Sequence, residues 1–282
     1  MKNILSSGRI PAFFFAISLV VASPTVWAKS AEMTLIPTRV VLEGNTRYAT
    51  VTVKNSGDGV GRYRIELIDA SMGEEGGVQL REDGSRDPFS ALDMISISPR
   101  SITLKPDEFQ TIRLLVKKKE GIADGEYRSH LKVKMVENDL DAETGKPNAE
   151  NAAIALKPKL VMVIPVIIRY GETSYKATLE EAKIVEGGGD KPNPQARLVL
   201  GFEGTRSLVS DVKITHVGTD GKDTLLKFFP GVAIYRGTAR RAINIPLEVP
   251  AGVNIRSGKI TATLLTQEKE GGKVLAEKVV TP

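Results

Sequence analysis

Hydrophobic and polar residues alternate with a period of two along most of the chain beyond residue 28. Clear examples are Ala49–Val53, Tyr63–Leu67 and Leu131–Met135. Such alternation is typical of strands that bury one face. Turn-forming clusters such as residues 55–59 and 105–107 separate these stretches, at about the 8–12-residue spacing that antiparallel sandwiches show. The pattern therefore predicts an all-β protein.

A second set of alternating stretches follows Tyr170, and it comprises Ala196–Phe202, Asp211–Val217, Ala242–Val249 and Lys259–Thr266. The most helix-like stretch, Thr178–Val185, is short and ends before three glycines at 187–189, which we interpret as a flexible hairpin tip. Each set of strands is close to the size of one immunoglobulin-like sandwich of about 100 residues. We therefore expect two such domains, residues 29–170 and 171–282. One large barrel is the competing architecture.

The first 28 residues differ in kind from the rest of the chain. Lys2 and Arg9 precede or flank an apolar run, Ile10–Ala22, and residues 26–28 resemble a signal-peptidase site. The run is shorter than the roughly 20 residues of a membrane span. Residues 1–28 are therefore predicted to be a cleaved secretory signal, with a retained anchor as the alternative. We expect an exported protein without stable membrane insertion.

Composition and histidine placement exclude several kinds of chemistry. The 282 residues contain no cysteine, which rules out disulfides and thiolate sites, and a net charge of +5 is too mild to indicate nucleic-acid binding. His130 and His216 are far apart in the sequence, without partners for a metal site or a catalytic triad. We interpret both as strand-surface residues. No enzymatic activity, metal or cofactor is expected.

The most informative segment is Ala152–Arg169, which follows a polar connection at residues 137–151. Its even-numbered face is wholly apolar and comprises Ile154, Leu156, Pro158, Leu160, Met162, Ile164, Val166 and Ile168. The other face begins with Lys157 and Lys159 and becomes apolar towards its end. This gradient predicts a strand whose first half lies at a sheet edge and whose second half is in the core. The simplest interpretation is that its side chains fill their own core. An apolar, alternating edge strand is an aggregation hazard that proteins normally blunt, and here it is retained.

Several segments of the first domain match one known family in order and spacing. They are PTRVVLEG (37–44), VTVKNSG (51–57), YRIEL (63–67), ISPRSITLKPDEFQTIRL (97–114), GEYRSHL (125–131) and VIPVIIR (163–169). Through these segments the first domain resembles the PapD-like periplasmic chaperones of pilus assembly. In the second domain the resemblance rests on position and length alone.

The resemblance implies two immunoglobulin-like domains arranged as a boomerang. It implies a chaperone that lends one strand to an incomplete pilus or fimbrial subunit and delivers that subunit to an outer-membrane usher. The donor-strand residues would be Ile154, Leu156, Leu160 and Met162.

The resemblance also implies basic residues that hold the subunit's C-terminal carboxylate. Arg39 matches the family's arginine, whereas the family's lysine position falls on Pro165. Either a register difference brings Lys159 to the cleft as the second anchor, or the chain is a divergent branch that anchors its subunit differently. An exposed donor strand is also compatible with self-association of the free form. The alternative is an exported β-sandwich module for binding or adhesion, which would show clustered surface aromatic residues.

Overall fold

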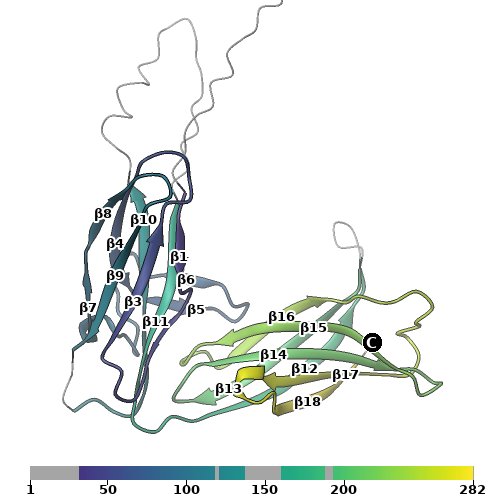
Figure 1. The fold of residues 1–282 in the computed structure, drawn as a ribbon. Coiled ribbons are helices and arrows are strands. Elements are labelled where there is room, and N and C mark those ends of the chain that lie inside the picture. The colour runs from purple at the N-terminus through teal and green to yellow at the C-terminus, as the bar shows by residue number, and fades with distance from the viewer. Residues whose placement is uncertain (1–31, 118–120, 137–159, 188–192, 282) are drawn as a thin grey trace, which may run out of the picture.

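Two β-sandwiches meet at an elbow in the computed structural model (Figure 1). The structure describes residues 32–117, 121–136, 160–187 and 193–281. The predicted signal, the connection at 137–151 and the predicted site residues Ile154, Leu156 and Lys159 lie outside these ranges. Among the described residues, no helix is long and apolar enough to cross a membrane.

The first sandwich consists of two facing sheets and a hairpin. One sheet has the order β1-β3-β9-β7 and the other the order β2-β11-β10-β4-β8, while β5 and β6 form the hairpin. The strands are β1 (Thr34–Ile36), β2 (Val40–Leu42), β3 (Tyr48–Lys54), β4 (Gly61–Ile68), β5 (Ala70–Met72), β6 (Val78–Leu80), β7 (Ile95–Ser98), β8 (Ser101–Leu104), β9 (Phe109–Val116), β10 (Gly125–Val136) and β11 (Val161–Tyr170), with a short 3₁₀ helix at Leu92–Met94.

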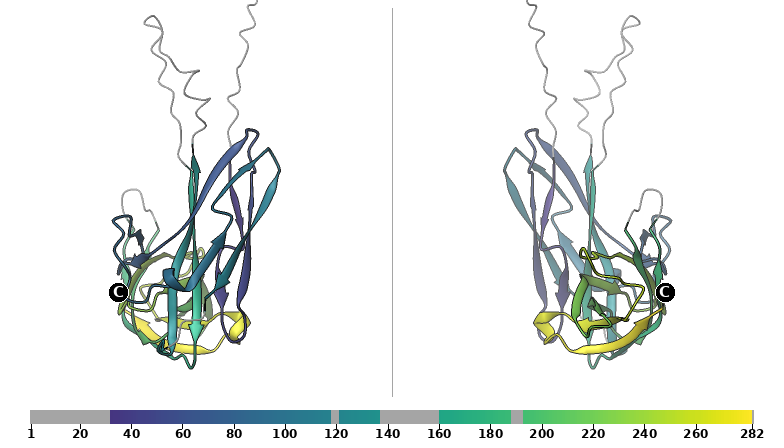
Figure 2. Two further views of the ribbon diagram at one scale, coloured as in Figure 1. Left: turned by 90° about the vertical axis from the view of Figure 1, so that its left-hand side faces the viewer. Right: turned by 90° about the vertical axis from the view of Figure 1, so that its right-hand side faces the viewer.

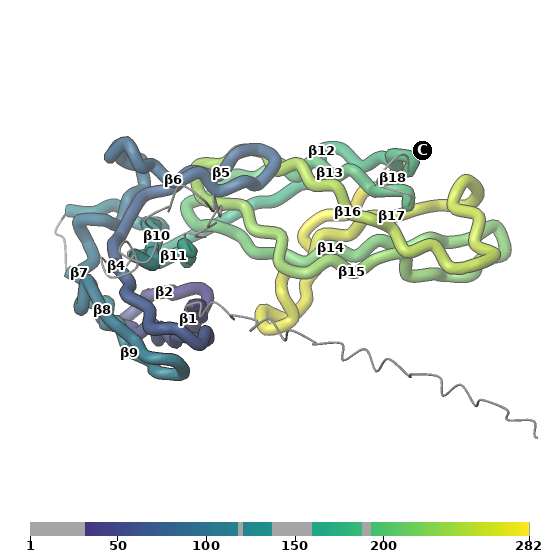
Figure 3. Tube along the Cα trace, turned by 90° about the horizontal axis from the view of Figure 1, so that it is seen from above, coloured from purple at the N-terminus to yellow at the C-terminus, as the bar shows by residue number. Residues whose placement is uncertain are grey.

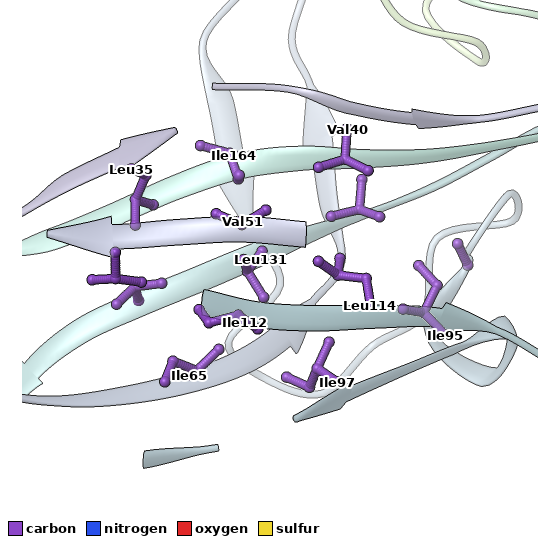
Figure 4. Packing of buried hydrophobic residues seen from close by; sticks show 14 of the residues in the cluster. Leu35, Val40, Val51, Ile65, Ile95, Ile97, Ile112, Leu114, Leu131 and Ile164 are labelled. Atoms are coloured by element: carbon purple, nitrogen blue, oxygen red, sulfur yellow. The ribbon is translucent and has the colours of Figure 1, made fainter. Parts of the chain in front are cut away.

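The core of this sandwich follows from the alternation in the sequence. Val51, Ile112 and Leu131 are fully buried, and Figure 4 shows their side chains in the space between the sheets. Each such side chain stabilises the fold by roughly 1.5–3 kcal/mol relative to its exposed state. The predicted half-buried strands are thus present, with their apolar faces directed inward.

The second sandwich is built in the same way around its own core. Its sheets have the orders β12-β13-β16 and β15-β14-β17-β18. The strands are β12 (Tyr175–Val185), β13 (Gln195–Gly204), β14 (Leu208–Val217), β15 (Asp223–Ile234), β16 (Arg240–Pro246), β17 (Lys259–Thr266) and β18 (Val274–Val280), with a 3₁₀ turn at Glu268–Glu270. Two separate hydrophobic cores confirm the predicted pair of sandwiches and exclude one large barrel. The proposed boundary at residues 170 and 171 falls between β11 and β12.

The sequence pattern misrepresented two strands of this second sandwich. The helix-like stretch Thr178–Val185 belongs to β12, and a bulge between Leu179 and Glu181 inserts one residue into its alternation. Strand β15 was not predicted, because two register shifts against β14 and Pro230 disrupt its period. In both strands the bulge changes which residues face the core.

The two sandwiches contact each other through the polar face of β10 and through the β5–β6 hairpin. Arg236 Nη1 donates a hydrogen bond to the Glu126 carbonyl at 2.8 Å, and the guanidinium of Arg128 lies 3.8 Å from the centre of the Tyr235 ring. Figure 2 shows the second sandwich packed against one end of the first, and Figure 3 shows the hairpin reaching over the second sandwich. The contact between the sandwiches thus buries the face of β10 on which the polar residues lie.

Candidate functional site

Strand β11 has a partner along only part of one edge. It pairs antiparallel with β10 over its whole length, from Val161 to Tyr170. On the opposite side it pairs in parallel with β2, through residues 166–168 only. Within the described ranges, no strand pairs with residues 161–165 on that side. We call residues 161–165 the open edge.

The backbone groups of the open edge can be assigned from the register. Met135 N–H donates to the Leu160 carbonyl at 2.9 Å, so the polar groups of Leu160 point towards β10. Because these directions alternate along an antiparallel pair, those of Val161, Val163 and Pro165 point away from β10. Pro165 has no N–H to offer. In the parallel register with β2, the Pro165 carbonyl faces the N–H of Val40, so the open edge presents two outward donors and two outward acceptors, from Val161 and Val163.

The side chains of β11 follow the gradient predicted from the sequence. On the outer face, Val161 is 40% exposed and Ile167 is completely buried. On the inner face, Ile164 belongs to the core, while Leu160 and Met162 are partly buried against it. Of the four predicted donor-strand residues, the described part of the chain therefore contains two, and both retain some exposed apolar surface next to the open edge.

Arg39 lies at the end of the open edge, immediately before β2. Val40 is aligned with Val166, so the preceding residue, Arg39, is aligned with Pro165. Pro165 is in turn aligned with His130 of β10. The three residues therefore form one row across the outer face of the sheet. The guanidinium of Arg39 has no hydrogen-bond or ion-pair partner in the described part of the chain, and it can accept an anionic ligand.

The described cations flanking this row on β10 already have partners. Lys132 Nζ lies 2.7 Å from a Glu82 carboxylate oxygen and 3.3 Å from one of Glu66, and the hydrogen bond with Glu82 raises the pKa of the lysine. Arg128 stacks on Tyr235, and its burial lowers the pKa of the guanidinium. Neither Lys132 nor Arg128 is therefore free to bind a further carboxylate, as Arg39 is. Lys159 stays the predicted second anchor.

The interpretation of the two histidines as surface residues is wrong. His130 is 2% exposed, and its two ring nitrogens have no partner among the described residues. Burial, and secondarily Arg128, lowers the pKa of His130 to about 4. His216 is also buried, with Nε2 at 2.6 Å from the Ser257 carbonyl oxygen. The alternation of β10 made its outer face look solvent-exposed, but Tyr235 of the second sandwich lies beside His130 there.

A second buried polar group, which the sequence analysis did not single out, connects the sandwiches. The fully buried carboxylate of Glu126 accepts hydrogen bonds from Ser207 Oγ and from Arg169 Nε, the latter at 3.2 Å. Arg128 Nη1 lies 3.9 Å from the same carboxylate, and Arg169 also pairs with the exposed Glu43 at 3.0 Å. The sequence signal for this junction was two closely spaced charged residues, Glu126 and Arg128, just before the predicted strand Leu131–Met135.

Among the described residues of the first sandwich, the two most exposed aromatic side chains lie far apart. Tyr48 is 70% exposed and Phe109 is 66% exposed on the β1-β3-β9-β7 sheet. Tyr48 begins β3, whereas Phe109 is aligned with Lys54 at its end. Six residues of strand separate the two positions by about 20 Å. A flat ligand could not stack on both.

The fold and the site together define a protein of two immunoglobulin-like sandwiches in which the partly open edge of β11 ends at Arg39, an arginine without a partner among the described residues. No family model and no curated protein matches the chain. Solved structures to which the chain is similar include a chain of the CsuC–CsuE chaperone–tip adhesion subunit pre-assembly complex from archaic chaperone-usher Csu pili of Acinetobacter baumannii (14% identity, 89% of this chain and 99% of that chain, TM-score 0.43).

Two further examples are a chain of the Salmonella enterica SafA pilin complex with the SafB chaperone (17% identity, 90% and 97% covered, TM-score 0.41) and the periplasmic chaperone SfaE (12% identity, 89% and 100% covered, TM-score 0.40). Each of these structures is a chaperone or a complex that contains one.

Proposed function

We propose that this protein is a periplasmic chaperone that binds pilus or fimbrial subunits by donor-strand complementation and delivers them to an outer-membrane usher. The observation that carries the proposal is the open edge at residues 161–165, which has unpaired outward backbone groups and ends at Arg39. A subunit that lacks one strand of its own sandwich would complete it with β11 and the residues preceding β11. Ile154 and Leu156 would extend the apolar side chains available for this purpose.

The position of Arg39 selects the direction of the bound strand. Strand β2 runs parallel to β11 and starts directly after Arg39. A subunit strand that runs in the same direction along the open edge therefore ends with its carboxyl terminus at Arg39. In the opposite direction its amino terminus would meet the guanidinium, which repels that charge. A charge-assisted bond between Arg39 and the terminal carboxylate thus favours the parallel orientation and fixes the register.

Apolar burial provides the larger part of the expected binding energy. Each buried side chain, such as Leu160 or Met162, contributes up to roughly 1.5–3 kcal/mol, and each backbone hydrogen bond about 0.5–1.5 kcal/mol. The Arg39 carboxylate bond adds roughly 1.5–3 kcal/mol. Many apolar subunit strands could provide the apolar burial and the backbone hydrogen bonds. Only a free C-terminus placed at Arg39 provides the third contribution, so the arginine is expected to determine register.

Arg39→Ala is expected to reduce capture of subunits by about 10- to 100-fold, because the charge-assisted bond is lost. The measurement is co-expression with subunits encoded near this gene, followed by recovery of the one-to-one complex from the periplasm. Arg113→Ala is the matched control, because Arg113 is an exposed arginine on the other sheet. Undiminished recovery with Arg39→Ala would remove the anchoring role.

Val163→Pro is expected to leave the first sandwich folded and to weaken subunit capture by about fivefold or more, because it removes one outward N–H donor from the open edge. Pro165 already occupies an equivalent outward position in the same strand. The matched control is Thr103→Pro in β8, at the other edge of this sheet. Ile65 N–H bonds the Arg100 carbonyl, so the N–H of Thr103 also points outward by alternation. Equal capture by both variants would argue against strand addition at β11.

A further inference from the structure

Strand β16 is an edge strand of the second sandwich, and the first sandwich covers the middle of its free edge. Phe202 N–H donates to the Ala239 carbonyl at 2.8 Å, so by alternation the polar groups of Ala242 point away from β13. Ala242 N–H donates to the Glu74 carbonyl at 2.8 Å, and its own carbonyl accepts from Arg241 Nη1 at 2.9 Å. The turn of the β5–β6 hairpin thus satisfies the centre of this edge.

Charges of opposite sign surround that backbone contact. Glu74 Oε1 lies 3.5 Å from Arg240 Nη1, and Glu75 Oε1 lies 3.3 Å from Arg197 Nη2. Arg241 Nη1 also lies 3.5 Å from the Glu74 carbonyl oxygen. Two carboxylates at the hairpin tip therefore face three guanidinium groups on β13 and β16. Partly exposed pairs of this kind are individually weak and screened by salt, so their effect depends on acting together.

Gly76 is required for the hairpin tip to approach β16 in this way. Its φ of +79° is a left-handed conformation that favours glycine, and a Cβ atom there would overlap the guanidinium of Arg241. The guanidinium would have to leave its two carbonyl partners. Gly84, in the same sandwich, has the same φ of +79°, but a Cβ atom there would meet no atom within 4 Å. The two glycines therefore share their backbone conformation and differ in the contact with the second sandwich.

We propose that the hairpin tip at residues 73–77 is an interdomain latch, which holds the two sandwiches at one angle and closes the β16 edge to other strands. The junction at Glu126 provides one attachment between the sandwiches, and the latch provides a second one. With one attachment alone, the sandwiches would reorient relative to each other, as linked domains do by default. The latch stands independently of the proposed chaperone function.

The test measures the distance between the sandwiches in the full chain. Because the chain has no cysteine, Lys105→Cys and Lys269→Cys place one spin label on each sandwich at exposed positions. Double electron–electron resonance is expected to give a narrow distance distribution for this background. Adding Gly76→Ala is expected to broaden the distribution by about twofold, whereas adding Gly84→Ala leaves it unchanged. An unchanged distribution with Gly76→Ala, or equal broadening with both variants, would overturn the proposal.

A second variant keeps the test decisive if Gly76→Ala does not fold. Glu74→Gln combined with Glu75→Gln alters two exposed side chains and removes the charges without straining the backbone. This variant is expected to broaden the distribution in low salt, as should about 1 M NaCl in the unsubstituted hairpin, because salt screens the same pairs. A distribution that stays narrow in both conditions would contradict the latch.

Discussion

Glu126→Ala is expected to lower the free energy of unfolding by about 3–5 kcal/mol. The carboxylate of Glu126 is fully buried between the sandwiches, where it accepts hydrogen bonds from Ser207 and Arg169. Its removal takes from the buried guanidinium of Arg128 a carboxylate that lies 3.9 Å away, and from Arg169 its buried partner. A buried charge that has lost its partner cannot regain hydration without opening the junction. Urea unfolding followed by far-ultraviolet circular dichroism measures the loss.

The matched control for this prediction is Glu43→Ala. Glu43 pairs with the same arginine, Arg169, at 3.0 Å, but its side chain is 60% exposed. An exposed pair contributes about 0–1 kcal/mol, so this variant should unfold close to the wild-type midpoint. The contrast isolates burial, because both variants remove one carboxylate from Arg169. Similar midpoints for the two variants would show that the Glu126 junction does not stabilise the fold.

Folding stability is expected to fall by about 2 kcal/mol between pH 7 and pH 5 because of His130 alone. Burial lowers its pKa to about 4 in the native state, whereas an unfolded histidine has a pKa near 6.5. Between these values the unfolded chain binds a proton that the native chain does not. The contribution of His130 to the free energy of unfolding is therefore fully present above about pH 6.5 and is lost as the pH falls towards 4. Arg128 nearby opposes protonation, while Asp69 weakly favours it.

Two single variants assign this pH dependence, because the chain contains only two histidines. His130→Phe keeps an aromatic ring beside Tyr235 and removes the titrating group, so its stability should change less between pH 7 and pH 5. His216→Phe serves as the control in the second sandwich, because it removes the other histidine and leaves His130 in place. Unfolding free energies from urea titrations at each pH measure both slopes. A slope that persists in His130→Phe and disappears in His216→Phe would show that His216, and not His130, causes the pH dependence of stability.

The sequence predicted those parts of the fold in which alternation maps directly onto burial. Val51 and Leu131 alternate with polar residues, and both are fully buried as expected. The gradient along β11 was also predictable, because apolar residues fill both faces of the strand only towards its end. Strands β12 and β15 were not recognised, since their bulges shift the period midway. A pattern of fixed period cannot represent an inserted residue.

The candidate site was predictable only where it depends on a single strand. Arg39 came from a motif, and its alignment with Pro165 required the pairing of β2 with β11. His130 and Glu126 were assigned to the surface or passed over, because their burial depends on the second sandwich. Contacts between domains leave no period in the sequence of either partner. Donor-strand use of Leu160 and Met162, and the anchoring role of Lys159, stay predictions.

Pro165 also explains why β2 does not pair with the open edge of β11. In the parallel register of β2 and β11, the next backbone hydrogen bond towards the N-terminal end of β11 would be donated by the N–H of residue 165 to the carbonyl of Thr38. Proline has no N–H and cannot form that hydrogen bond, so the pairing of β2 with β11 does not extend further towards the N-terminal end of β11. Pro165 thus limits the pairing of β2 to residues 166–168 and leaves the backbone groups of Val161 and Val163 accessible to a strand from another chain.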